Sequence, residues 1–299
     1  MTTQNSPPPS LWHHCLNPHS QKPALTFIHG WASDSQVWLP FAKAFCDDFQ
    51  VHLLDLPGFG QSPPLSLDTK NGNQIAQHWN AAILQTLPAQ THLIGWSLGG
   101  LLAQRLIATA PHRILSLINL ASTPKFVQTE NWPFAVSPRL MKDFIQAVSQ
   151  EYGSLLKQFW RLQFQGSDDA RKWMKRLQTQ MQNRSLPSLT GLLQGLYILK
   201  DLDNRPLCQT DAKTENHLPK SPAPPMAWLL GEKDPLIPLE LNQSLIANFP
   251  MQIIQGAGHM PFFSHPQETE KALQSLFNQI QSLKNNSEQP HHSNTKKPV

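Results

Sequence analysis

The sequence predicts an α/β fold in which a mostly parallel, doubly wound sheet carries an inserted helical lid. Short apolar runs alternate with helical patterns in the first and last parts of the chain, which is typical of a parallel sheet with helices on both faces. Between these parts, residues 123–222 show helical patterns but no clear strands. Polar residues and glycines follow several of the apolar runs, at the strand ends where such sheets bind ligands.

The apolar runs are nearly continuous rather than alternating, as expected for parallel strands that are covered on both faces. We expect strands at residues 25–28, 51–54, 92–96, 115–120, 227–230 and 252–254. We expect core helices at residues 37–45, 73–87, 98–109, 239–248 and 267–283, and lid helices at 139–163 and 168–182.

This pattern divides the chain into a core, a lid and two tails. The core comprises residues 23–122 and 223–284, and the lid with its linker comprises residues 123–222. The linker at residues 210–225 is polar and then rich in proline. We expect residues 1–22 to form a flexible leader and the polar residues 285–299 to be a disordered tail.

Composition excludes several functional classes. Hydrophobic residues make up 39% of the 299 residues, which is enough for a core, and the net charge of +4 is too small for a typical nucleic-acid-binding surface. Three widely spaced cysteines without a CxxC motif indicate neither a disulfide framework nor a zinc site. No secretory signal and no apolar stretch of about 18 residues is present. We therefore expect a cytoplasmic monomer that binds neither membrane nor nucleic acid.

A nucleophile motif follows the third expected strand. Residues 95–99 read Gly-Trp-Ser-Leu-Gly and match G-x-S-x-G between a strand and a helix. In that context the serine lies on a sharp turn, and its oxygen stands clear of the sheet. We therefore predict that Ser97 is the nucleophile of a serine hydrolase.

A serine nucleophile needs a base and an orienting carboxylate, which follow it in this chain order. Asp234 comes after the fifth expected strand in a loop stiffened by two prolines, with Glu232 as the rival acid. His259 comes after the last strand, preceded by Gly256 and Gly258, and His265 is its nearest competitor. We predict Ser97, Asp234 and His259 as a catalytic triad.

Two backbone amides are candidates for binding the oxyanion. The first is that of Leu98, directly after the nucleophile, and the second is that of Trp31, in the His-Gly-Trp sequence that ends the first strand. Each such donor can contribute about 3 kcal/mol to transition-state binding. The Trp31 side chain is also expected to line the substrate pocket.

Residues 29–31, 55–60, 95–100 and 258–261 together resemble the α/β-hydrolase superfamily. More narrowly, the chain resembles the family of pimeloyl-[acyl-carrier protein] methyl ester esterases, the carboxylesterases of biotin synthesis. That narrower resemblance is carried by Trp96 before the nucleophile and by residues 121–126, 131–133 and 159–163.

The resemblance implies hydrolysis of a methyl ester on a pimeloyl chain that acyl carrier protein holds, with release of methanol and without metal or organic cofactor. It implies an acyl channel lined from the lid by Phe159, Trp160, Arg161, Leu162 and Gln163. It also implies that basic lid residues dock the carrier protein, and the candidates are Arg171, Lys172, Lys175 and Arg176. A solvated helix face would give the same basic pattern.

Other functions of the same fold stay open at this point. A general short-chain carboxylesterase or a C–C hydrolase or lyase of the menaquinone type would use the same triad. Epoxide hydrolases and dehalogenases are disfavoured, because they carry aspartate where this chain has Ser97. The complete triad argues against a non-catalytic ligand receptor of the same fold, which would not need one.

Overall fold

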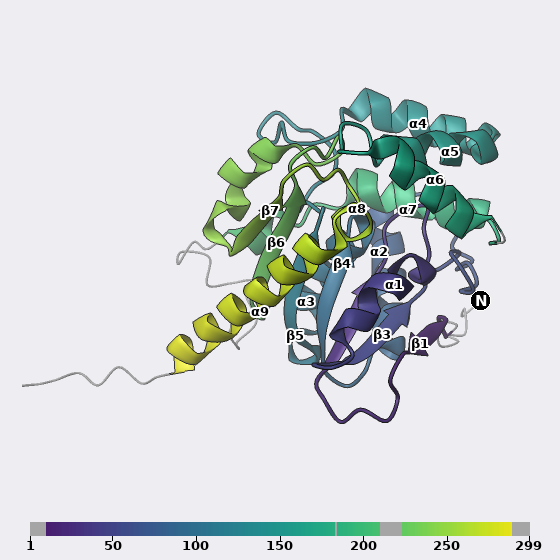
Figure 1. Cartoon of the computed structure of the whole chain (residues 1–299). Helices are drawn as coiled ribbons and strands as arrows, with labels where there is room; N and C mark the ends of the chain where they lie inside the picture. Colours follow the sequence, from purple (N-terminus) through teal and green to yellow (C-terminus); the bar gives the residue numbers. More distant parts are fainter. Residues whose placement is uncertain (1–9, 183, 210–222, 289–299) are drawn as a thin grey trace, which may run out of the picture.

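The computed structural model describes residues 10–182, 184–209 and 223–288. Within them, one sheet has the strand order β1-β3-β2-β4-β5-β6-β7 and lies at the centre of the molecule (Figure 1). β1 pairs antiparallel with β3, and all other neighbouring strands are parallel. The predicted fold class is therefore confirmed. The strands are β1 His13–Cys15, β2 Ala24–Ile28, β3 Gln50–Leu54, β4 Thr91–Trp96, β5 Ile114–Leu120, β6 Met226–Gly231 and β7 Met251–Ile254.

Every predicted strand is present, with its ends shifted by at most one residue. β1 was not predicted, because its residues are polar and lie in the range expected to be a flexible leader. In the structure His13–Cys15 pairs with β3 and forms the edge of the sheet. The ordered sheet therefore begins inside that range. Residues 1–9 lie outside the described part of the chain.

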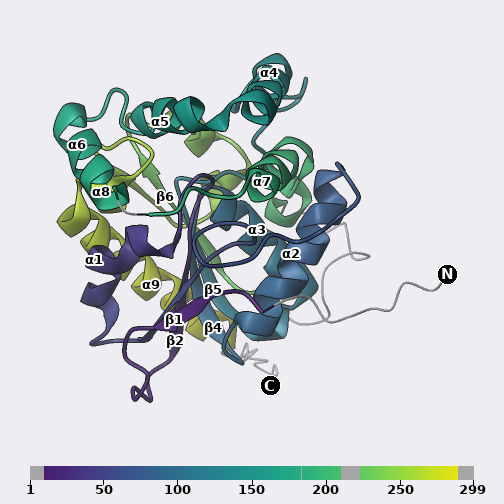
Figure 2. The same cartoon turned by 90° about the vertical axis from the view of Figure 1, so that its right-hand side faces the viewer.

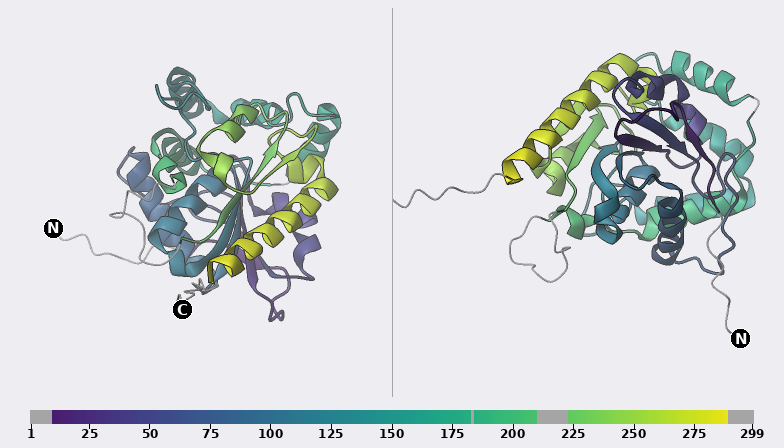
Figure 3. Two further views of the ribbon diagram at one scale, coloured as in Figure 1. Left: turned by 90° about the vertical axis from the view of Figure 1, so that its left-hand side faces the viewer. Right: turned by 90° about the horizontal axis from the view of Figure 1, so that it is seen from below.

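Helices cover both faces of the sheet. α1 and α9 lie on one side and α2 and α3 on the other (Figure 2), and two further views show the same layers (Figure 3). The helices are α1 Leu39–Ala42, α2 Gly72–Thr86, α3 Leu98–Thr109, α4 Pro138–Gln150, α5 Tyr152–Leu162, α6 Ala170–Met181, α7 Leu189–Asp201, α8 Pro261–Ser264 and α9 Pro266–Glu288.

Two predicted core helices are less regular than expected. The segment at 37–45 consists of α1 between short 3-10 turns, Ser35–Trp38 and Lys43–Phe45. The segment at 239–248 consists of two 3-10 turns, Leu239–Gln243 and Leu245–Asn248. Of the predicted tail, residues 285–288 belong to α9, and the rest lies outside the described residues, as does most of the linker at 210–225.

The lid consists of α4, α5, α6 and α7, which lie over the carboxyl ends of the parallel strands (Figure 1). The helical pattern at 139–163 forms two helices, because Glu151 adopts an extended conformation between them (φ −151°, ψ 101°). α7 was not predicted. It packs beside α2 and returns the chain from the lid to the core. Within the described residues, no helix is long and apolar enough to cross a membrane.

Candidate active site

Ser97 lies on the sharp turn that joins β4 to α3, with a positive φ of 55° and ψ of −119°. Few residues other than glycine adopt this region of backbone space, and such strain persists only where the surroundings impose it. The neighbouring glycines make the turn possible, because a Cβ atom on Gly95 would lie 2.6 Å from the Cα atom of Gly100. The sequence therefore lifts the Ser97 hydroxyl above the strand ends, as the motif predicted.

The structure brings the three predicted triad residues together in one hydrogen-bonded chain. His259 Nε2 lies 3.0 Å from Ser97 Oγ, and His259 Nδ1 lies 2.7 Å from Asp234 Oδ2. All three residues are buried, and His259 is the most deeply buried of them. With its Nδ1–H donated to the carboxylate, the imidazole has Nε2 free to accept the serine proton.

The two rival residues have other partners. Asp234 Oδ1 accepts hydrogen bonds from the amides of Leu236 (2.8 Å) and Ile237 (3.1 Å), so its second oxygen is fixed toward His259. Glu232 Oε2 instead accepts from the Gly256 amide at 2.8 Å. His265 Nδ1 bonds to the Ser264 hydroxyl at 2.8 Å. The geometry therefore favours Asp234 and His259 over both rivals.

The lid and core fix the position of the imidazole. The His259 amide donates to the carbonyl of Gln163 in the lid at 2.9 Å. The His259 carbonyl accepts from the Trp96 indole at 2.8 Å. Trp96 is itself held in an aromatic cluster, with ring centroids 5.2 Å from Phe262 and 6.1 Å from Trp38. A rigid frame of this kind keeps a general base in reacting geometry.

The segments that carry the two candidate oxyanion donors both adjoin Ser97. Leu98 is the first residue of α3, so its N–H has no carbonyl partner one turn earlier in the helix. Trp31 follows Gly30, where an added Cβ would lie 3.1 Å from Ser97 Cβ. Glycine at this position therefore lets the loop that carries Trp31 approach the nucleophile closely.

His29 has a structural role that the sequence analysis did not assign. Its Nδ1 donates to the Gly30 carbonyl at 2.8 Å, and its Nε2 accepts the Leu56 amide at 2.9 Å. The ring is fully buried, and this burial lowers the pKa of His29 and keeps the imidazole neutral. His29 thus connects the ends of β2 and β3.

An apolar cavity of about 150 Å³ opens onto Ser97. A cavity of this size holds about six carbon atoms. Trp31 forms one wall, and the rings of Phe144 and Phe159 pack edge-on against it at 5.4 and 4.8 Å. The lining residues are Trp31, Ser97, Phe126, Val136, Leu140, Met141, Phe144, Phe159, Leu162, Leu196, Leu199 and Leu236.

The five lid residues predicted to line the channel divide into three groups. Phe159 and Leu162 line the cavity. Trp160 and Gln163 are buried supports: the Trp160 indole donates to the Ala32 carbonyl at 3.0 Å, and the Gln163 carbonyl accepts from His259. Arg161 is exposed and lines an outer groove that shares Phe159 and Leu162 with the cavity.

Much of the cavity wall was not predicted. The additional residues come from α4, α7 and the segment after β5, and Leu236 follows Asp234. Amphipathic periodicity in the lid helices could have indicated the apolar face. It could not have shown that this face turns toward Ser97 rather than toward the core.

The four basic residues proposed for docking lie on α6, and all are exposed. Lys172 lies 4.6 Å from the centroid of the Trp173 ring, and Arg176 lies 5.1 Å from that of Phe263. These contacts hold two of the cations against aromatic faces at the edge of the lid. Arg171 and Lys175 complete the surface.

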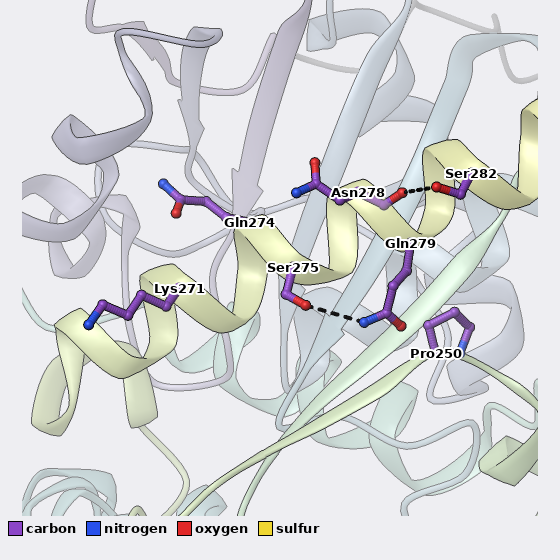
Figure 4. Close-up of a pocket in the computed structure, with 7 residues that line it drawn as sticks. All are labelled: Pro250, Lys271, Gln274, Ser275, Asn278, Gln279 and Ser282. Carbon is purple, nitrogen blue, oxygen red and sulfur yellow. Dashed lines mark hydrogen bonds between the residues drawn. The ribbon is translucent and has the colours of Figure 1, made fainter.

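Other depressions lie away from the triad. One of them runs beside α9 and contains none of the predicted site residues (Figure 4). Most of the residues that line it are polar or charged, and the Gln279 side chain donates to the Ser275 hydroxyl within it at 3.2 Å. Among the described residues, no group of three or more His, Cys, Asp or Glu side chains is placed to hold a metal ion.

Comparisons with known proteins agree with this architecture. The pimeloyl-[acyl-carrier protein] methyl ester esterase of Aeromonas salmonicida is 34% identical over 83% of this chain and 92% of its own length. The corresponding esterase of Stenotrophomonas maltophilia is 35% identical over 84% and 92%. An esterase structure from Exiguobacterium antarcticum matches with a TM-score of 0.71 and 20% identity, over 91% of this chain and 95% of that one. The family model of the alpha/beta hydrolase fold matches residues 23–266. The chain therefore belongs to the α/β-hydrolase fold family.

Proposed function

We propose that this protein is a serine carboxylesterase that hydrolyses the methyl ester of a pimeloyl chain carried on acyl carrier protein. The observation that carries the proposal is the hydrogen-bonded chain of Ser97, His259 and Asp234 at the mouth of an apolar cavity. The names of the relatives that are about 34% identical over most of this chain support the substrate. Such a carrier protein would place the reaction in the cytoplasm.

In the first half of the reaction, His259 Nε2 takes the proton of Ser97 Oγ while that oxygen attacks the ester carbonyl. Asp234 stabilises the imidazolium that forms. The amides of Trp31 and Leu98 bind the developing oxyanion. The tetrahedral intermediate then collapses, and His259 gives its proton to the departing methanol. The acyl chain stays bound to Ser97 as an ester.

In the second half, His259 removes a proton from a water molecule that attacks the acyl-enzyme carbonyl. The same two amides bind the second oxyanion. Collapse of this intermediate returns the proton to Ser97 Oγ and releases the free carboxylate. Atoms balance as ester plus water giving acid plus methanol, and neither metal nor organic cofactor takes part.

The cavity suits the methylene chain of the proposed substrate. A pimeloyl chain has about five methylene groups, and each buried methylene contributes about 0.8 kcal/mol. Full burial would therefore stabilise the bound chain by about 4 kcal/mol, or about a thousandfold in kcat/KM relative to an acetyl ester. The lining has no charged side chain, so it binds a neutral methyl ester better than a free carboxylate.

The basic face of α6 would dock the acidic carrier protein. Exposed cations accelerate encounter with an acidic partner and act weakly at high salt. Exchanging Arg171 and Lys175 for glutamate should raise KM for the carrier-bound ester and leave p-nitrophenyl acetate hydrolysis unchanged. Lys22→Glu is the control: Lys22 is exposed and precedes β2, at the end of the sheet opposite the lid, so this change should alter neither substrate's KM. Equal effects of both variants would contradict this docking face.

The central experiment compares substrates with purified enzyme. We expect kcat/KM to be highest for the pimeloyl methyl ester on carrier protein, lower for dimethyl pimelate and lowest for methyl acetate. Expression in a biotin auxotroph that lacks its own pimeloyl ester esterase should restore growth, and the Ser97→Ala variant should not. Equal rates on acetyl and pimeloyl esters, without rescue of growth, would favour a general short-chain esterase instead.

A further inference from the structure

A buried ion pair joins the lid to the segment that carries Trp31. We call residues 29–36 the oxyanion loop. Arg184, between α6 and α7, donates from Nη1 to Asp34 Oδ1 in this loop at 2.8 Å, across 150 residues of sequence. The two side chains are only 10% and 6% exposed. The same Asp34 oxygen accepts the Gln36 amide at 2.9 Å and caps the short 3-10 turn that follows.

The oxyanion loop has a conformation that needs such support. Ala32, directly after Trp31, has a φ of 60°, in the left-handed region that costs a non-glycine residue about 1–2 kcal/mol. Its carbonyl accepts the Trp160 indole from α5 at 3.0 Å. The Ala32 carbonyl and the Asp34 carboxylate are therefore both held by lid side chains.

A further contact brings α6 itself onto the loop. Gln180 Nε2 donates to the Gln36 carbonyl at 3.0 Å. Lid side chains thus bond to three positions of the loop, Ala32, Asp34 and Gln36, and of these contacts the one between Arg184 and Asp34 is an ion pair. The Trp31 indole in turn donates to the carbonyl of Leu192 in α7 at 2.9 Å. The lid is therefore bonded directly to the loop that flanks Ser97.

The charges decide which contact matters most. Burial raises the pKa of the Asp34 carboxyl, and the Arg184 guanidinium is the largest influence that lowers it. Removing the arginine would leave a buried carboxylate without a cation, which is strongly destabilising at that position. The loop would then rearrange to hydrate Asp34, and Trp31 lies three residues away in the same loop.

We propose that Arg184 and Asp34 are positioning residues: their ion pair fastens the lid to the oxyanion loop and holds the Trp31 amide where it binds the ester carbonyl. The inference rests on the proposed function, because it assigns that amide to oxyanion binding. It goes further in making a lid residue necessary for the chemical step itself. Even an ester too short to reach the lid cavity requires the pair.

The test is the hydrolysis of p-nitrophenyl acetate by Arg184→Met, at a temperature well below the midpoint of unfolding. We expect kcat to fall by between about tenfold and about a hundredfold, with KM nearly unchanged. Complete loss of one oxyanion donor lowers kcat about a hundredfold or more, so it sets the upper end of this range. Arg184→Lys should recover part of the lost kcat, since it restores the positive charge. Thermal unfolding of each variant is measured in parallel.

Three further variants separate positioning from stability. Asp34→Asn keeps an oxygen for the Gln36 amide and removes the charge, and it should lower kcat as Arg184→Met does. The double variant should be no slower than the slower single variant, because both changes break one contact. Arg139→Met is the control. It removes a lid ion pair with Asp143 in which the two side chains are 93% and 62% exposed, and it should change neither kcat nor KM.

Each result has a distinct meaning. A wild-type kcat in Arg184→Met, with a lower unfolding temperature, would show that the pair only stabilises the fold and would overturn the inference. Loss of activity in Arg139→Met as large as that in Arg184→Met would overturn it too. Failure of the wild-type enzyme to hydrolyse any ester would instead refute the proposed function.

Discussion

The Asp234→Asn substitution tests the proposed triad most sharply, because the structure dictates how the new amide must be oriented. Asp234 Oδ1 accepts the amides of Leu236 and Ile237. An asparagine keeps these two bonds only if its oxygen takes that place. Its NH2 group then faces His259 Nδ1, where the carboxylate oxygen lies 2.7 Å away in the wild-type protein.

This orientation reverses the tautomer of the imidazole. Facing a donor, Nδ1 of His259 must become an acceptor, and the proton moves to Nε2. Nε2 then cannot accept the proton of Ser97 Oγ, although the two atoms stay about 3.0 Å apart. In the serine protease from which the triad mechanism is described, the same change lowers kcat about 10⁴-fold, which corresponds to about 5.5 kcal/mol in the activation barrier.

The assay measures kcat for a methyl ester and for p-nitrophenyl acetate at neutral pH, with thermal unfolding as a check on the fold. We expect a fall of about 10⁴-fold on both substrates and an unfolding temperature near that of the wild-type protein. Glu232→Gln is the matched control, because Glu232 bonds to the Gly256 amide rather than to His259. A kcat within tenfold of wild type in Asp234→Asn, or a larger loss in Glu232→Gln, would refute the reasoning.

Three further predictions concern the nucleophile, the cavity and the sheet edge. Ser97→Ala should abolish turnover and labelling by a fluorophosphonate without changing the unfolding temperature by more than a few degrees; residual wild-type turnover would exclude Ser97 as nucleophile. Leu199→Trp should fill the cavity and lower kcat/KM for pimeloyl esters at least tenfold while sparing acetyl esters; equal losses would place the acyl chain elsewhere. Burial and the neighbouring His13 lower the pKa of His52 to about 4, so below its ordinary value of 6.5 the unfolded chain binds a proton that the folded chain does not. The free energy of unfolding should therefore fall between pH 6.5 and 4, and His52→Gln should flatten this slope in denaturant titrations at several pH values.

The sheet could be predicted from the sequence because its physics is local. Parallel strands buried on both faces require apolar runs, such as those at 92–96 and 115–120, and each was found within one residue. The edge strand β1 was missed for the same reason. Its residues His13 and His14 are exposed and polar, so nothing in their pattern distinguishes them from a leader.

The candidate site was predicted where position along the chain restricts the choice of residue. Ser97 lies in a motif, and Asp234 and His259 follow strands in a known order. The cavity and the Arg184–Asp34 pair could not be predicted in this way, because they depend on which face of the lid meets the core. A contact across 150 residues leaves no periodic signal in one sequence.

The cavity beside Ser97 also bears on how a turnover ends. Hydrolysis exchanges a neutral ester for an anion, and no cationic side chain lines the space that the anion would occupy. A carboxylate there would be stripped of its hydration shell with no compensating ion pair, so the acid departs and does not compete with fresh ester. The apolar wall that favours the neutral ester therefore binds the charged acid less well, and we expect the free acid to be a weak inhibitor.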